Sequence, residues 1–277
     1  MSGRFTALRE RAFMHWQGES DGMRNRFLRH LEKIEFVVTN ACTGRCKHCS
    51  EGEHPLRGER IDPEIAADAV RKISSVYDVK TVMAFGGEPL LYTDAVEAIM
   101  NAAREKNIPR RQVITNGYFS KDPERIGRVA RMLADCGVND LLLSVDAFHG
   151  ECIPMDTVRL FASEVKRLGI KTRISPAWLV SATDDNPYNE KTRAWLRFFA
   201  DLEIPVGEGN VVFFEGSAKK YLAEYFTGVH PINPYEEDAS DVRCVSFSPN
   251  GDVLGKNVYK TDILEIIKNY TPDVGEK

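Results

Sequence analysis

The stretch "NACTGRCKHCS", residues 40–50, places three of the chain's six cysteines in one short segment, here called the cysteine loop. The residues "IEFVV" at 34–38 come just before it and have the apolar, β-branched character of a buried strand. Six cysteines among 277 residues are too few for a disulfide scaffold, so a tight group of thiols indicates metal binding or redox chemistry. The segment therefore predicts a first strand that ends in a reactive loop.

Downstream of residue 33 the chain alternates between short β-rich runs and amphipathic helices, a rhythm that is typical of parallel βα units. Asp62 and Pro63 open the first of these helices as its N-cap and its first helical residue. The predicted strands span residues 34–38, 81–85, 112–115, 140–145, 171–175 and 210–214. Six such units predict an α/β fold, a partial (βα)6 TIM-like barrel over residues 33–215, in place of a complete eightfold barrel.

The two ends of the chain depart from this rhythm. Residues 1–32 are charged and predict an N-terminal helical extension. Residues 216–277 predict a small C-terminal extension, with a loop at 230–238, a hairpin that turns at Asn250-Gly251, and a last helix near 263–267. No linker marks residues 1–32 as a separate domain.

The composition is that of an ordinary globular protein, with 43% hydrophobic residues, 28% charged residues and a net charge of -4. Without an excess of Lys and Arg we expect no nucleic-acid partner. No apolar run of signal-peptide length opens the chain, and none approaches the roughly 18 residues of a membrane helix. We therefore expect a cytoplasmic protein with no membrane partner.

The cysteine loop lies where a parallel barrel gathers its functional groups, at the carboxyl end of a strand. Three thiolates can bind three irons of a cubane iron–sulfur cluster, which leaves the fourth iron open to a small molecule. The alternative is a zinc site that uses the three thiolates and His48 or a distant side chain. Zinc usually takes four ligands, often in paired short spacings, and no second pair follows here.

The C-x3-C-x2-C spacing of Cys42, Cys46 and Cys49, with the aromatic His48 before the last cysteine, resembles the radical S-adenosylmethionine (SAM) superfamily. "GGEPL" at 86–90 follows the second predicted strand, where that superfamily carries its glycine-rich SAM-binding stretch. "TNGY" at 115–118 and "SVD" at 144–146 end the next two strands and also resemble stretches of the family. The resemblance covers about residues 33–215.

The resemblance implies an enzyme whose 4Fe-4S cluster is held by Cys42, Cys46 and Cys49, with SAM bound to the open iron. One electron, from a donor of flavodoxin or ferredoxin type, then splits SAM and gives a 5'-deoxyadenosyl radical that abstracts hydrogen from a substrate. It also implies a set of SAM contacts: Gly86, Gly87 and Glu88 around the methionine moiety, His48 near the adenine, and Asn116 and Ser144 as further contacts. No catalytic residue toward the substrate is assigned.

The other three cysteines have separate interpretations. Cys136 lies on an apolar helix face, which predicts a buried structural thiol. Cys152 follows "DAFHGE" after the fourth strand, where it or His149 could supply a proton or hydrogen atom to the substrate; a plain loop contact is the alternative. Cys244, ahead of "SPNGDV", resembles a truncated form of the C-terminal extension in the peptide-modifying, SPASM-type branch. Because no cysteine follows the hairpin, we expect a single cluster per chain.

We therefore expect a radical SAM enzyme of unidentified substrate, and the C-terminal resemblance favours modification of a peptide or protein. The alternative is a small-molecule reaction in cofactor or nucleoside-sugar biosynthesis by the same chemistry. A second alternative is a non-catalytic iron–sulfur binding or sensing protein. The intact glycine-rich stretch argues against that alternative, because a pure sensor needs no SAM pocket.

Overall fold

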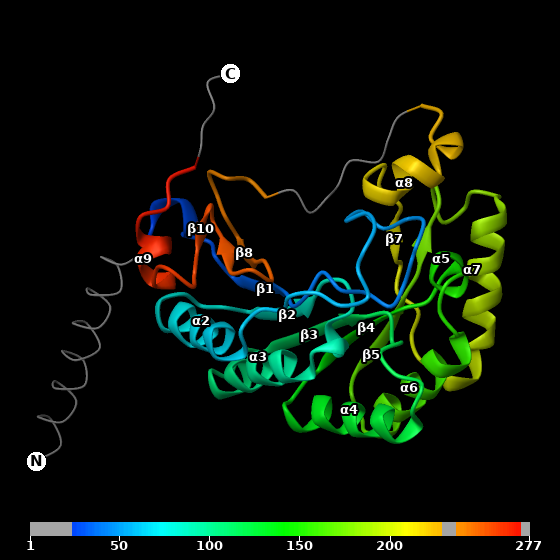
Figure 1. The fold of residues 1–277 in the computed structure, drawn as a ribbon, viewed down its shortest axis with the longest axis horizontal. Coiled ribbons are helices and arrows are strands. Elements are labelled where there is room, and N and C mark those ends of the chain that lie inside the picture. Colours follow the sequence, from blue (N-terminus) through cyan, green and yellow to red (C-terminus); the bar gives the residue numbers. More distant parts are fainter. Residues whose placement is uncertain (1–23, 229–236, 273–277) are drawn as a thin grey trace, which may run out of the picture.

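The computed structural model describes residues 24–228 and 237–272, and its centre is a six-stranded parallel sheet (Figure 1). The strand order is β5-β4-β3-β2-β1-β8. The strands are β1 (Lys33–Val37), β2 (Thr81–Phe85), β3 (Arg110–Thr115), β4 (Asp140–Ser144), β5 (Thr172–Ser175) and β8 (Cys244–Phe247). The described residues form no closed barrel, so the prediction of an α/β partial barrel is confirmed.

Helices line the outer face of the curved sheet (Figure 1). The longer ones are α2 (Pro63–Val76), α3 (Thr93–Glu105), α4 (Pro123–Asp135), α6 (Met155–Arg167) and α7 (Pro187–Phe198). Helix α2 begins as predicted: the Asp62 carboxylate accepts hydrogen bonds from the Glu64 and Ile65 amides at 2.9 and 3.0 Å. Such a cap is worth about 1 kcal/mol. Ile73 on its inner face is fully buried, which contributes roughly 1.5–3 kcal/mol of hydrophobic stabilisation.

The register of the central strands determines which loops meet. Val37 at the end of β1 lies opposite Phe85 at the end of β2. The cysteine loop after β1 and the glycine-rich stretch after β2 therefore leave the sheet side by side. On the other flank of β1, Phe36 pairs in register with Phe247 of β8, and their rings stack at 4.7 Å.

The predicted sixth strand at 210–214 forms at its first two residues, but it does not join the main sheet. Residues Asn210–Val211 form β7, which pairs with β6 (Ala177–Trp178) in a separate two-stranded sheet. Pro176 lies between β5 and β6, and because proline has no N–H it cannot continue a hydrogen-bonded ladder. Beyond β5, Ile174 forms an isolated bridge with Val206, and the Asn210 amide donates to the Pro176 carbonyl at 3.0 Å.

The predicted turn at Asn250-Gly251 forms, with the Gly251 amide donating to the Ser248 carbonyl at 2.9 Å, but the antiparallel strand pair lies further along the chain. The sixth strand of the main sheet is β8, which runs parallel to β1 because Phe247 is buried against Phe36. The antiparallel pair is instead β9 (Asp252–Val253) with β10 (Lys256–Asn257). Its turn residues Leu254 and Gly255 both have positive φ, at 48° and 70°, as a two-residue hairpin turn requires. The predicted domain boundary at residue 215 thus separates strands of one sheet.

The remaining short helices are α5 (Ala147–Gly150), α8 (Gly216–Tyr221) and α9 (Ile263–Lys268), the last of which confirms the predicted terminal helix. The predicted N-terminal helical extension lies mainly outside the described residues, which there include only the 3-10 turn Arg26–Leu28. The predicted loop at 230–238 also lies almost entirely outside them. Among the helices that the structure describes, none is long and apolar enough to cross a membrane.

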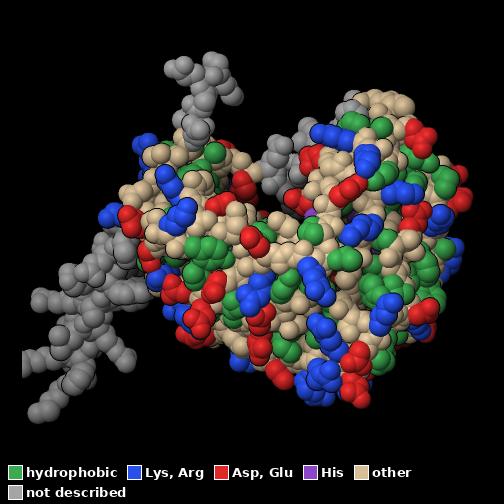
Figure 2. Space-filling view, in the orientation of Figure 1, with side chains coloured by type: hydrophobic (Ala, Val, Ile, Leu, Met, Phe, Trp, Pro, Cys, Tyr) green, Lys and Arg blue, Asp and Glu red, His purple; other side chains and the backbone are tan. Residues whose placement is uncertain are grey.

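The surface is hollowed between the part that carries β8 and α9 and the part that carries α7 and α8 (Figure 2). In Figure 1 the chain that follows β1 runs between these two parts. Acidic and basic side chains alternate over the visible face, with no large patch of one sign. The fold therefore presents the cysteine loop at a concave side of the sheet.

Candidate active site

Backbone hydrogen bonds fix the cysteine loop to its two neighbours. The Gly87 amide donates to the Thr39 carbonyl and the Glu88 amide donates to the Ala41 carbonyl, both at 2.8 Å. The Thr43 hydroxyl donates to the Tyr118 carbonyl at 2.6 Å. The loops after β1, β2 and β3 thus form one connected layer at the carboxyl edge of the sheet.

Three thiols surround Gly44, at the middle of the cysteine loop. A Cβ added to Gly44 would lie 3.1 Å from the Cys46 sulfur and 3.7 Å from the sulfurs of Cys42 and Cys152. A side chain at this position would fill the space between the thiols, so the glycine leaves it open. All six cysteines are free, which keeps these sulfurs available as ligands.

The third predicted ligand, Cys49, has a different neighbour. Its sulfur lies 3.1 Å from the Nε2 atom of His54, and the Nδ1 atom of His54 lies 2.8 Å from the Asn40 carbonyl oxygen. Burial raises the pKa of Cys49 and raises that of Cys42 to about 11. The hydrogen bond with Cys152, together with burial, raises the pKa of Cys46. The metal-free thiols are therefore protonated at neutral pH, and metal binding has to release their protons.

The two glycines of "GGEPL" allow the close contact between the β1 and β2 loops. A Cβ on Gly86 would lie 2.6 Å from the Thr39 carbonyl oxygen, and one on Gly87 only 2.2 Å from the Ala41 oxygen. Gly86 also has φ +135°, a conformation that other residues rarely adopt. These residues are thus required for the packing of the loop layer, in addition to any role in SAM binding.

Glu88 is fully buried, and donors of the chain itself surround its carboxylate. One oxygen accepts from the Leu90 amide and the Thr115 hydroxyl at 2.9 and 2.8 Å, and the other accepts from the Asn116 amide at 2.9 Å. Burial outweighs these bonds and raises the pKa of Glu88 to about 7. The side chain therefore joins the β2 loop to the end of β3, a role that the sequence reasoning missed.

The two weaker SAM candidates lie differently. The side-chain nitrogen Nδ2 of Asn116 lies 3.2 Å from the Thr43 hydroxyl and 3.6 Å from the Cys42 sulfur. The Asn116 side chain therefore faces the cysteine loop. Ser144 ends β4 in register with Ser175 of β5 and is half-buried. Within the described part of the chain, no hydrogen bond connects Ser144 to the cysteine loop.

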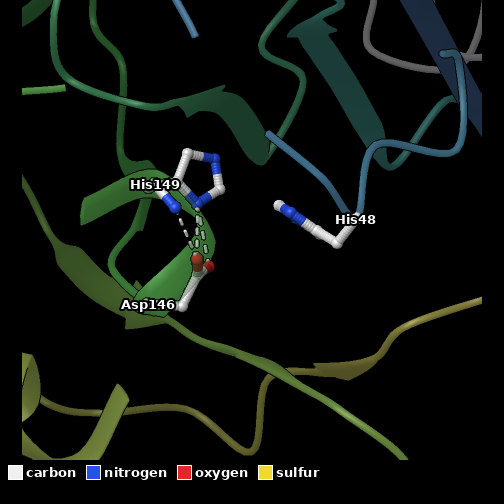
Figure 3. Close-up of side chains that lie close together, drawn as sticks. All are labelled: His48, Asp146 and His149. Carbon is white, nitrogen blue, oxygen red and sulfur yellow. Dashed lines mark hydrogen bonds and ion pairs between the residues drawn. The ribbon is translucent and has the colours of Figure 1, made fainter. Parts of the chain in front are cut away.

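His48 of the cysteine loop lies beside Asp146 and His149, and the possible ligand atoms of the three side chains are all within 4.8 Å of one another (Figure 3). The Nδ1 atom of His149 lies 2.9 and 2.8 Å from the two carboxylate oxygens of Asp146. Asp146 is 1% exposed and also accepts from the backbone amides of His149 and Ala177. Because these bonds pair the charges directly, the group needs no metal ion to be stable.

The charges of this group follow from its geometry. Burial opposes ionisation of Asp146, but His149 outweighs it and lowers the pKa of Asp146 to about 2. Burial likewise lowers the pKa of His149, but Asp146 outweighs it, and the net pKa is raised. His48 has no such partner, and burial lowers its pKa to about 4. The site thus contains a hydrogen-bonded Asp146–His149 pair beside a neutral imidazole.

The neutral ring of His48 is held by aromatic neighbours. It lies 4.7 Å from the Phe148 ring and 5.1 Å, edge to face, from the His149 ring. Its Nδ1 atom is buried and has no hydrogen-bond partner among the described residues. Such an atom is costly to bury, so it fits a site whose ligand supplies the missing partner.

The other cysteines divide between the site and the scaffold. Cys152 lies at the end of α5, with its sulfur 3.5 Å from that of Cys46. Cys136 is 2% exposed and donates to the Leu133 carbonyl, which confirms a buried structural thiol. Cys244 lies opposite Lys33 at the start of β1, away from the loop edge. Cys244 therefore cannot join the group around Gly44.

A parallel partial barrel that carries a three-cysteine loop after its first strand defines an α/β iron–sulfur class of protein. Residues 36–172 match the family model of the radical SAM superfamily, and the chain belongs to this superfamily. It is a radical SAM enzyme, and the family uses a 4Fe-4S cluster and SAM. The predicted superfamily, enzyme class and cofactors are thus confirmed.

Curated relatives include the probable GTP 3',8-cyclase of Methanocaldococcus jannaschii, 28% identical over 129 residues that make up 47% of this chain and 41% of that protein. The probable GTP 3',8-cyclase of Saccharolobus islandicus (strain L.S.2.15) is 28% identical over 221 residues, 73% of this chain and 67% of the relative. The match to the first of these therefore spans less than half of that relative's length.

Two solved structures have the same fold. Streptococcus suis SuiB bound to S-adenosylmethionine aligns with a TM-score of 0.56 and 13% identity, over 99% of this chain and 72% of that one. Native anSMEcpe with bound AdoMet aligns with a TM-score of 0.54 and 13% identity, over 87% of this chain and 81% of that one. At this identity the likeness concerns the fold alone.

Proposed function

We propose that this radical SAM enzyme acts on a small molecule, such as a nucleotide, in cofactor biosynthesis. The curated relatives described above are GTP 3',8-cyclases, which supports the small-molecule alternative over peptide modification. The likeness to SuiB, also solved with a precursor peptide, is at 14% identity and supports no substrate. The sequence-based preference for peptides therefore gives way to the alternative.

The observation that supports the radical chemistry is the set of thiols in one loop, packed against the glycine-rich stretch. Cys42, Cys46 and Cys49 would hold three irons, and Gly44 leaves the space between two of these sulfurs open. His54 would hydrogen-bond to the ligand Cys49 through Nε2, while the Asn40 carbonyl fixes its ring through Nδ1. When bound, the cluster and SAM supply a 5'-deoxyadenosyl radical.

The chain's own residues bind, orient and exclude water. Gly86 and Gly87 let the β2 loop approach the ligand. Glu88 accepts from the backbone N–H of Asn116, whose side-chain amide faces the cysteine loop. The unpartnered Nδ1 atom of His48 fits a heteroaromatic ligand such as adenine, which offers both donors and acceptors. Ser144, at the end of β4, is a further proposed SAM contact.

The Asp146–His149 pair is the candidate for proton transfer in the site. Asp146 fixes the tautomer and orientation of the ring through Nδ1, which leaves Nε2 as the atom that can hold or release a proton. Phe148, which is 1% exposed, stacks on Tyr188 at 4.8 Å and closes this side of the site to water.

The substrate class is tested by adding GTP whose ribose carries deuterium to the reduced, cluster-loaded enzyme with SAM. We expect GTP or another purine nucleotide to accelerate SAM cleavage and to transfer deuterium into 5'-deoxyadenosine. A panel of short peptides serves as the comparison under the same conditions. Acceleration by a peptide and by no nucleotide would refute the small-molecule proposal.

A further inference from the structure

The fourth thiol at the cysteine loop has no part in the function proposed so far. Cys152 comes from the segment after β4, 106 residues beyond Cys46, yet the two sulfurs are 3.5 Å apart. The point where a Gly44 Cβ would lie is 3.7 Å from the Cys152 sulfur and 3.1 Å from that of Cys46. Both sets of distances thus place Cys152 against one of the proposed iron ligands.

Helix α5 and the turn that follows it position Cys152. The Asp146 carboxylate caps this short helix at the His149 amide, and the Cys152 amide donates to the His149 carbonyl at 3.0 Å. The Cys152 sulfur also lies 3.3 Å from the Phe148 carbonyl oxygen and 3.4 Å from that of His149. The thiol hydrogen therefore has three acceptors within reach: two neutral carbonyls and the sulfur of Cys46.

Iron binding changes the balance between these acceptors. A cysteine bound to iron has lost its proton and carries negative charge, so Cys46 can then only accept. A hydrogen bond to a charged acceptor is stronger than one to a neutral carbonyl. The Cys152 sulfur lies 3.5 Å from that of Cys46, so its S–H is placed to donate to this charged acceptor.

We propose that Cys152 donates an S–H···S hydrogen bond to iron-bound Cys46 and so makes the cluster easier to reduce. This rests on the proposed function, in which Cys46 is a ligand. Reduction adds negative charge to the cluster and its sulfurs, and a donor aimed at a ligand sulfur stabilises the reduced form more than the oxidised form. Cys152 is thus a positioning and tuning residue that acts through Cys46, with no iron of its own.

The test is the reduction potential of the cluster, followed by electron paramagnetic resonance during a stepwise reductive titration. Cys152→Ala removes the donor, and we expect its potential to be more negative than that of the wild type. Cys152→Ser keeps a donor at the same position, and its potential stays close to the wild type. Cys136→Ala removes a buried thiol elsewhere in the fold and should leave the potential unchanged.

A second measurement reports the hydrogen bond itself. In resonance Raman spectra, the Fe–S stretching bands of the wild type and Cys152→Ser should shift when H2O is replaced by D2O. The shift should be smaller for Cys152→Ala. Equal potentials and equal shifts in Cys152→Ala and wild type, at full iron content, would overturn the proposal. Loss of iron from both Cys152 variants would overturn it as well, because Cys152 would then be a ligand. A different result would show that the proposed function itself fails: Cys46→Ala would then still hold a full cluster, so Cys46 would not be a ligand.

Discussion

Replacing Glu88 by Ala should destabilise the fold by an amount that the buried hydrogen bonds allow us to work out. The substitution leaves the Leu90 and Asn116 amides, both bonded to the carboxylate, without acceptors in the interior. Each buried donor left unsatisfied costs about 1–3 kcal/mol, so two cost about 2–6 kcal/mol. This is a large part of the roughly 5–15 kcal/mol by which a domain is stable.

The assay is equilibrium unfolding of the metal-free, reduced chain in urea, with far-UV circular dichroism as the signal. Glu88→Gln keeps the oxygen that serves Leu90 and Thr115 but sets an amide against the Asn116 N–H, so about 1–3 kcal/mol should be lost. Glu97→Ala, on the exposed face of α3, is the matched control and should change stability by less than about 0.5 kcal/mol. A Glu88→Ala loss no larger than that of the control would refute the reasoning.

Three further outcomes are expected. Gly87→Ala should abolish iron binding, because its Cβ would lie 2.2 Å from the Ala41 oxygen of the cysteine loop. Gly127→Ala should bind iron normally, because the nearest atom to its Cβ is 4.0 Å away. Equal iron contents in the two variants would contradict this. Asp146→Asn removes the carboxylate that raises the pKa of His149 most. This pKa, followed by NMR titration, should therefore fall below that of the wild type; an unchanged pKa would show that Asp146 does not raise it. The folded pKa of Glu88 is raised from 4.5 to about 7, so its contribution to stability is full below pH 4.5 and is lost as pH rises through about 7. Urea unfolding at a series of pH values should therefore show a free energy of unfolding that falls over this range, and less so in Glu88→Gln. An unchanged dependence in Glu88→Gln would assign it to other groups.

Local signals explain what could be predicted of the fold. Asp62 and Pro63 determine where α2 begins, and the buried runs of β1 to β5 lie within one or two residues of the predicted ranges. The partner of β1 could not be predicted, because β8 lies more than 200 residues away and its choice depends on the stacking of Phe36 on Phe247. No local sequence pattern indicates which strands will pair when they lie this far apart in the chain.

The same distinction applies to the site. The three cysteines and the glycine-rich stretch each follow a predicted strand. Because the ends of parallel strands meet at one edge of the sheet, the sequence predicts that they lie close together. Glu88 was interpreted as a SAM contact from the family's glycine-rich stretch. Its internal bonds could not be predicted, because its three donors come from two different loops and no local pattern reveals them. The Asp146–His149 pair did carry a local signal, an aspartate N-cap three residues before a histidine. The approach of Cys152 to Cys46 depends on tertiary structure alone.

The central claim is that the cysteine loop supports reductive cleavage of SAM. The most direct measurement is chromatographic detection of 5'-deoxyadenosine after the anaerobically reconstituted enzyme is mixed with dithionite and SAM. We predict slow formation by the wild type and by Cys136→Ala, and none by Cys46→Ala. Equal formation by Cys46→Ala, or none by a wild type that holds a full cluster and binds SAM, would contradict the account.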